Sequence, residues 1–102
     1  MIDHNLKMGR GQIKIFLTKI LSEQLSLDES KIFTHSNISK LGADSLDVIE
    51  LLLKVEIEYD INIPDAEADA IFGEKSTISS IADYLAPLNK KRREKLKQLN
   101  KL

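Results

Sequence analysis

The chain has 102 residues, which is the length of one small domain that buries only a modest share of its surface and holds no large enclosed cleft. It contains no cysteine, which excludes disulfides and thiolate metal sites and suits a reducing compartment. The net charge of -1 conceals an asymmetry: residues 87–102 carry seven basic groups against one acidic group, whereas residues 1–86 carry eight against fifteen.

Residues 1–11 contain two glycines and no periodic pattern, so we expect a flexible N-terminal arm. From Gln12 onward, apolar residues recur at helical spacing, which predicts a helix of three to four turns with one face in the core. This stripe consists of Ile13, Phe16, Leu17, Ile20, Leu21 and Leu25. No apolar run approaches the roughly 20 residues of a membrane span, and the N-terminus lacks the apolar core of a signal peptide. We therefore expect a soluble, cytoplasmic protein.

Residues 26–43 form a long connection with four apolar anchors: Ile32, Phe33, Ile38 and Leu41. A connection of this length is what parallel packing of the flanking helices would require, because a short loop forces helices to pack antiparallel. His35 lies here without an acidic or histidine partner at ligand spacing, so no metal or catalytic role is predicted for it.

A second helix is predicted from about Ser45 to Tyr59. Gly42 precedes it as a breaker, Asp44 is a good N-cap, and Asp47 puts a second carboxylate in the first turn, where the helix dipole favours anions. Ser45 falls at the first helical position. Because Asp44 can cap the helix, the Ser45 hydroxyl stays free at the surface, beside backbone N–H groups that suit a phosphate.

The second helix has two apolar sides. Its expected core face comprises Val48, Leu51, Leu52, Val55 and Tyr59. The second stripe comprises Leu46, Ile49, Leu53 and Ile57. A small bundle needs one apolar face per helix, so we expect the second stripe to be at least partly exposed as a partner surface; the alternative is that the short helix and the loop cover it. Residues 44–69 contain nine acidic residues and one basic residue, a field that steers basic partners.

The rest of the chain predicts two more helices. Pro64 stops the second helix, and Asp65 caps a short third helix that ends near Ile71. A fourth helix is capped by Ser76 or Thr77, and Pro87 marks its end. Its inward stripe is Ile78, Ile81, Ala82 and Leu85. The expected fold is all-α: a small four-helix bundle with three longer helices, a short third helix and a long loop between the first two.

The residues around Ser45 do not form a catalytic site. The sequence there is not Gly-x-Ser-x-Gly, and neither His4 nor His35 is placed to act as a base. Such a serine is a poor nucleophile, although another enzyme can still modify it. Asp44 and Asp47 are interpreted as cap and recognition groups, and no metal motif or glycine-rich phosphate loop is present. The chain is predicted to be a non-enzyme without catalytic residues.

An ordered set of short segments carries a resemblance. They are Asp44-Ser45-Leu46, Glu50-Leu51, Tyr59-Asp60, Ile63-Pro64-Asp65, Ile81-Ala82-Asp83-Tyr84-Leu85 and Ile20-Leu21-Ser22-Glu23-Gln24-Leu25. Over residues 12–86 the chain resembles the acyl carrier proteins. The resemblance implies 4'-phosphopantetheine on Ser45, whose thiol holds acyl chains as thioesters for fatty-acid or related lipid biosynthesis, with the bundle core sheltering the chain.

The resemblance also implies partners: a phosphopantetheinyl transferase, and acyl-chain synthases and transferases with basic docking surfaces. The matching recognition positions are Asp44, Leu46, Asp47, Ile49, Glu50, Leu53 and Glu56. Three departures favour a specialised carrier, namely Ile57 at a position that is often acidic, an apparent insertion at residues 72–75, and the basic tail. A polyketide or peptide carrier, or an unmodified bundle whose tail binds a polyanion, stay open as alternatives.

Three segments are expected: an arm (1–11), a carrier-like domain (12–86) and a basic C-terminal tail (87–102) with Leu96 and Leu99 at helical spacing. For the tail, a solvated or folded-back state is favoured over binding to nucleic acid or an anionic membrane. We expect a tail that is mobile or locally helical with few contacts to residues 44–60, on a monomeric protein.

Overall fold

The computed structural model describes residues 9–100, and these form a bundle of helices. Four α-helices are α1 (Arg10–Leu25), α2 (Ser45–Tyr59), α3 (Asp65–Ile71) and α4 (Ile78–Asn100), with short 3-10 turns η2 (Glu29–Lys31) and η3 (Ile38–Leu41) in the first connection. Within this range there is no β-strand, only one isolated bridge between Asn37 and Thr77. The predicted all-α bundle with a short third helix is confirmed. Residues 1–8 of the predicted arm, with His4, lie outside the described residues.

The core is built from the predicted stripes. The expected inward residues of α1, α2 and α4 are all buried or packed against the core, and the connection adds Ile32 and Ile38. Phe33, also expected to be an anchor, is 63% exposed and is not part of the core. Ile32 and Phe33 are adjacent but differ in burial. Ile32, the C-cap residue of η2, is buried, whereas Phe33 lies at the surface.

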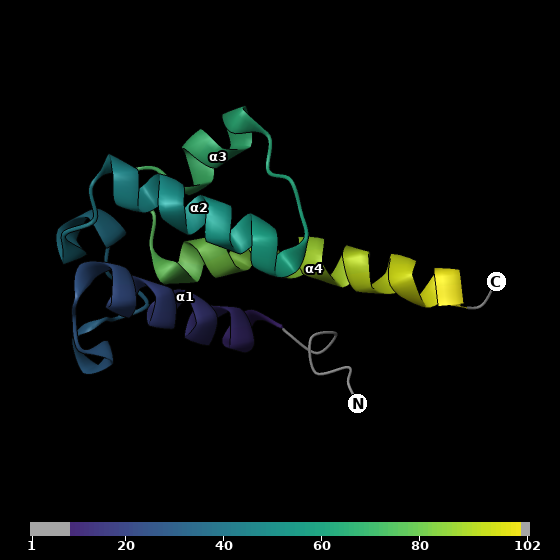
Figure 1. Ribbon diagram of the computed structural model, residues 1–102, viewed down its shortest axis with the longest axis horizontal. Coiled ribbons are helices and arrows are strands. Elements are labelled where there is room, and N and C mark those ends of the chain that lie inside the picture. Colours follow the sequence, from purple (N-terminus) through teal and green to yellow (C-terminus); the bar gives the residue numbers. More distant parts are fainter. Residues whose placement is uncertain (1–8, 101–102) are drawn as a thin grey trace.

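The helix directions correct one expectation. α2 and α4 run in the same direction and α1 runs opposite to both (Figure 1). Contacts at both ends agree: Gln24 near the end of α1 donates to the carbonyl of Asp47, and Phe16 in α1 meets the ring of Tyr59 at the end of α2, with centroids 5.5 Å apart. Parallel packing of α1 and α2 was therefore wrong. The long connection instead packs Ile38 into the core. It also contacts the start of α4, where the backbone N–H of Ser79 donates to the carbonyl of Thr34.

Two helix starts also differ in detail. α1 begins at Arg10, two residues before the predicted Gln12, and Arg10 pairs with Asp83 of α4. Pro64, not Asp65, occupies the N-cap position of α3, because Asp65 already has helical geometry and adds its carboxylate to the first turn. At the start of α4, Thr77 and Ser80 exchange hydrogen bonds of 2.9 Å, so the cap is Thr77 and not Ser76.

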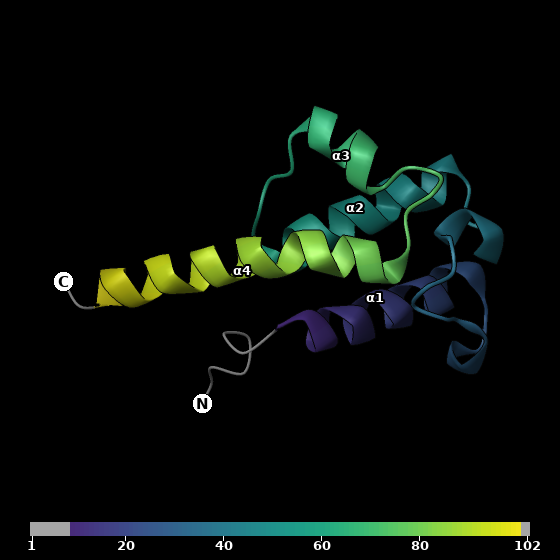
Figure 2. The same cartoon turned by 180° about the vertical axis from the view of Figure 1, so that it is seen from behind.

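The predicted end of α4 at Pro87 is wrong, since the helix continues to Asn100 and projects past the bundle (Figure 2). Pro87 lacks a backbone N–H and breaks one helical hydrogen bond. Helix formers follow it, and Asn89, two residues further on, is buried, so packing holds the helix across the proline. Of the two states expected for the tail, the described part is helical. An ion pair of 3.9 Å joins its Arg92 to Asp60 at the end of α2.

Candidate functional site

The start of α2 has the geometry that its sequence predicts. Asp44 has extended backbone angles, and its Oδ1 accepts a hydrogen bond of 2.9 Å from the N–H of Asp47. In return, the N–H of Asp44 donates to Oδ2 of Asp47 at 3.0 Å. This reciprocal pair is a capping box, which satisfies donors that a helix start otherwise leaves open. The hydrogen bond from the Asp47 amide is also the main cause that lowers the pKa of Asp44.

The capping box leaves the Ser45 hydroxyl free. Ser45 is the first residue of α2, its side chain is exposed, and its hydroxyl has no hydrogen-bond partner within residues 9–100. Gly42 turns the chain into this start with φ of 107°, a left-handed conformation that residues with a Cβ rarely adopt. The predicted position of Ser45 is thus observed: an unengaged hydroxyl on a fixed backbone.

A groove of about 480 Å³ opens beside Ser45, between α2, η3 and the end of α3. Its apolar lining includes Val48, Ile49 and Phe72, while Asp69 and Glu74 stand among its polar residues. The sequence pattern does not predict this wall, since residues 72–75 look like an insertion between two helices. Phe72 is instead 4% exposed and packed in the core. The signal that could have indicated a buried position was Phe72 itself, an aromatic residue in an otherwise polar link.

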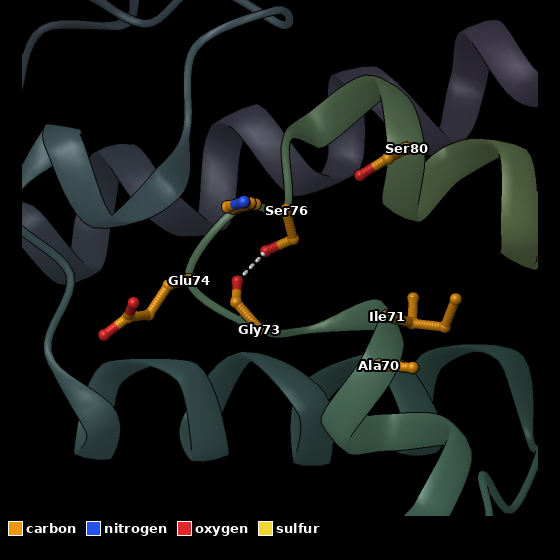
Figure 3. Close-up of a pocket in the computed structure, with 7 residues that line it drawn as sticks. Ala70, Ile71, Gly73, Glu74, Ser76 and Ser80 are labelled. Atoms are coloured by element: carbon orange, nitrogen blue, oxygen red, sulfur yellow. Dashed lines mark hydrogen bonds between the residues drawn. The ribbon is translucent and has the colours of Figure 1, made fainter.

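A second hollow of about 470 Å³ shares Gly73 and Glu74 with this groove (Figure 3). Its hydroxyls are already engaged: Ser76 donates to the carbonyl of Gly73 at 2.7 Å, and Ser80 takes part in the cap of α4. A Cβ on Gly73 would stand 3.0 Å from the carbonyl oxygen of Asp69, so this link has little room to change. The second hollow therefore offers no free serine hydroxyl.

The second stripe of α2 is exposed, as predicted. The exposed fractions are 67% for Leu46, 50% for Ile49, 51% for Leu53 and 80% for Ile57. The alternative, that α3 and the connection cover the stripe, is wrong for these side chains. An apolar stripe of this size beside acidic residues is a feature of partner-binding surfaces.

The acidic residues around the stripe differ in their freedom. Glu50 is exposed and Asp47 is half-buried in the capping box. Glu56, predicted as a recognition residue, accepts a hydrogen bond of 2.8 Å from the N–H of Ile63 through its Oε2. It therefore helps to hold the α2–α3 link. His35 is exposed in the connection, and no group of three or more metal-ligating side chains occurs in the described part of the chain.

The site can accept a group but cannot activate one. Within residues 9–100 no histidine or other base bonds to the Ser45 hydroxyl, so these residues offer it no activation as a nucleophile. A phosphate ester fits here, because the hydroxyl is exposed at the positive end of the α2 dipole.

Comparison with known proteins matches the chain to a protein family and to individual relatives. The family model described as the phosphopantetheine attachment site matches residues 16–85. A protein of Syntrophobacter fumaroxidans named acyl carrier protein is 42% identical over 80 residues, which cover 78% of this chain and 94% of the relative. No helix in residues 9–100 is both long and apolar enough to cross a membrane.

Proposed function

Because the chain belongs to the acyl carrier proteins, which carry covalent 4'-phosphopantetheine and catalyse no reaction themselves, we propose that Ser45 is the attachment residue. The carrier delivers acyl groups to enzymes of fatty-acid or related lipid biosynthesis. When bound, the prosthetic group supplies the terminal thiol that holds these acyl groups as thioesters.

One observation carries the assignment to Ser45. Its hydroxyl is exposed and unbonded, while the neighbouring Asp44 and Asp47 side chains are held in the capping box. The helix start is therefore complete without Ser45, and modification of its oxygen breaks no hydrogen bond of the fold. The positive end of the α2 dipole also favours the negative phosphodiester.

The groove beside Ser45 supports a sheltering role. Val48, Ile49 and Phe72 offer an apolar wall to an acyl chain, and burial of such a chain is favourable by about 0.8 kcal/mol for each CH₂ group. Within the proposed carrier domain, residues 12–86, α2, η3 and the end of α3 would thus protect the cargo between deliveries.

The recognition surface follows from the exposed side of α2. Leu46, Ile49 and Leu53 offer apolar contacts, and Asp44 and Glu50 offer negative charge. A phosphopantetheinyl transferase and the acyl synthases and transferases would bind here through basic surfaces. Glu56 contributes by fixing the α2–α3 link, and Asp47 by fixing the start of α2. The protein would act as a monomer in the cytoplasm.

Incubation with coenzyme A and a phosphopantetheinyl transferase tests the assignment. Intact-mass measurement should show one added phosphopantetheinyl group, which Ser45→Ala abolishes. Ser39 also lines the groove, and its hydroxyl bonds to the carbonyl of Glu74. Ser39→Ala is therefore the matched control and should keep the modification. Addition of the group to a different serine would refute the assignment.

A specialised acyl carrier is the second candidate. Ile57 is 80% exposed and lengthens the apolar stripe beyond Leu53, so partner enzymes with larger apolar docking surfaces would be favoured. Loading assays with synthases of the fatty-acid, polyketide and peptide classes separate these pathways, since the cognate enzyme should load this carrier fastest. An unmodified interaction module is no longer a candidate, because the family carries the prosthetic group.

A further inference from the structure

The inward stripe of α4 continues after the bundle ends. Residues at the spacing i, i+3 and i+4 form one line along the helix: Ile81, Leu85, Leu88, Arg92, Leu96 and Leu99. The first two are fully buried, and Leu88 is half-buried. Arg92 pairs with Asp60, the C-cap residue of α2, so this ion pair marks the end of the bundle. Beyond it the stripe reaches solvent, with Leu96 37% and Leu99 62% exposed.

Basic side chains flank this exposed stripe. At about 100° per residue, Lys91 and Lys95 fall on one flank and Arg93 and Lys97 on the other. Glu94, the one acidic residue of this stretch, falls on the opposite side of the helix. Residues 90–99 therefore combine six basic groups with one acidic group, and they place the acid away from the leucines. We refer to residues 90–99 as the basic overhang.

We propose that the basic overhang docks on the surface of a membrane rich in anionic lipids. A helix with leucines on one side and lysines around them binds in the plane of the lipid headgroups, because the leucines enter the acyl boundary while lysine stems reach back to the phosphates. Each basic residue near such a surface adds electrostatic attraction to the anionic lipids. Nucleic acid fits less well, because the overhang contains no aromatic residue for base stacking and nucleic acid would leave the leucines exposed.

The docked orientation follows from the fold. Ser45 begins α2 at one end of the molecule, and the overhang leaves the other end (Figure 1). The 15 residues of α2 alone span about 22 Å. The acidic residues of α2 and α3 are repelled by anionic lipid, so the bundle would point away from the membrane with Ser45 toward solution.

Vesicle flotation tests the docking with the full-length chain. Vesicles of phosphatidylcholine with about a third phosphatidylglycerol should bind the protein at least tenfold more strongly than phosphatidylcholine alone. Lys95→Glu with Lys97→Glu should reduce binding by about tenfold or more. Lys31→Glu with Lys40→Glu makes the same charge change at exposed positions in the first connection, so this control should change binding by less than about twofold.

The leucines provide the second test. Leu96→Gln with Leu99→Gln keeps good helix formers and all charges, and should weaken vesicle binding by about tenfold. Undiminished binding of this variant, together with displacement of the wild-type protein by RNA, would overturn the proposal in favour of a polyanion site. Equal binding to neutral and anionic vesicles would overturn it as well.

Single cysteines can report the orientation, because the natural chain has none. An environment-sensitive dye on Leu99→Cys should shift its emission to the blue when anionic vesicles are added, and the same dye on Ser45→Cys should not. A shift at both positions, or at position 45 alone, would overturn the proposed orientation. These readouts do not involve the prosthetic group, so they are independent of the function proposed for Ser45.

Discussion

At the scale of single residues, the capping box makes Asp44 a stabilising group whose effect depends on pH. The pKa of Asp44 is lowered, chiefly by the hydrogen bond from the amide of Asp47. A lowered folded-state pKa adds stability above the unfolded pKa of about 4, and this contribution is lost as pH falls through the folded value. We predict that Asp44→Ala lowers the melting temperature by a few degrees at pH 7.

The same measurement at lower pH provides the check. The difference in melting temperature between wild type and Asp44→Ala should begin to shrink as pH drops below about 4, where the unfolded-state carboxylate takes up a proton, and should shrink further as pH falls through the lower folded-state pKa. A difference that stays constant from pH 7 to pH 3 would show that the charge on Asp44 contributes nothing to the cap.

Tyr59 provides a second prediction at this scale. The residue is 2% exposed, and its hydroxyl has no hydrogen-bond partner in the part of the chain that the structure describes. Burial raises the pKa of this hydroxyl. An unpaired buried hydroxyl costs free energy, so Tyr59→Phe should leave the free energy of unfolding unchanged or raise it by up to about 1 kcal/mol. Urea unfolding measures this change, and a clear loss of stability would indicate a bound water on the hydroxyl.

The sequence predicts the residues around Ser45 well because their interactions are local. Asp44, Ser45 and Asp47 lie within one helical turn, so capping chemistry alone fixes their arrangement. Phe72 and Glu56 were placed less well because their roles depend on distant partners. Phe72 packs in the core beside the groove, and Glu56 bonds to the backbone of Ile63, seven residues away.

At the scale of helices, the two sides of α2 should separate stability from recognition. Leu51 is fully buried and Leu53 is 51% exposed, although they are two residues apart. Leu51→Ala should lower the free energy of unfolding by about 2–5 kcal/mol. Leu53→Ala should change it by no more than about 0.5 kcal/mol.

Kinetics of phosphopantetheinyl transfer complete this pair of variants. Leu53→Ala should raise the KM of the transferase for the carrier severalfold, since it removes an apolar contact of the recognition surface. Leu51→Ala, measured below its melting temperature, should leave this KM nearly unchanged. The reverse pattern would mean that the exposed stripe of α2 has no part in recognition.

Helix patterns predicted which residues face inward, but not every helix end or direction. The 3.6-residue period settles the core faces of α1, α2 and α4 because burial acts on each face directly. Connection length only permits a parallel or antiparallel arrangement, so it could not fix the direction of α1. The continuation of α4 past Pro87 depends on tertiary packing around Asn89, which outweighs the local cost of a proline.

At the scale of the whole molecule, the acidic segment of residues 44–69 should control the rate at which basic partners associate. Glu50 is exposed on α2, and residues 44–69 offer only Lys54 to balance nine acids. We predict that Glu50→Lys slows phosphopantetheinyl transfer by about tenfold at low salt, and that the loss shrinks as salt screens the field. Glu29→Lys makes the same charge change at an exposed position in η2 and serves as the control. Equal losses in both variants would point to net charge alone.

The overhang should be separable from the carrier bundle. Removal of residues 95–102 should leave the fold and the modification of Ser45 intact, because the side chains of residues 95–99 are exposed and lie beyond the Arg92–Asp60 ion pair. Backbone NMR spectra of the full-length and shortened chains should differ only near the new C-terminus. Shift changes along Asp47, Glu50 and Lys54 would show instead that the segment rests on α2. A cut before Asn89 should be more harmful, because Asn89 is buried.

The crowded carboxylates of α2 and α3 attract basic partners, but they destabilise the folded state. Charges of one sign repel each other in the compact state, and unfolding relieves this repulsion by moving them apart. Added salt weakens the repulsion within a Debye length of about 8 Å at physiological ionic strength. The same salt that slows the approach of a basic enzyme should therefore raise the melting temperature of the free protein. A bound basic partner would likewise weaken the repulsion between these carboxylates. We therefore expect α2 to be most rigid while a basic enzyme is bound to it.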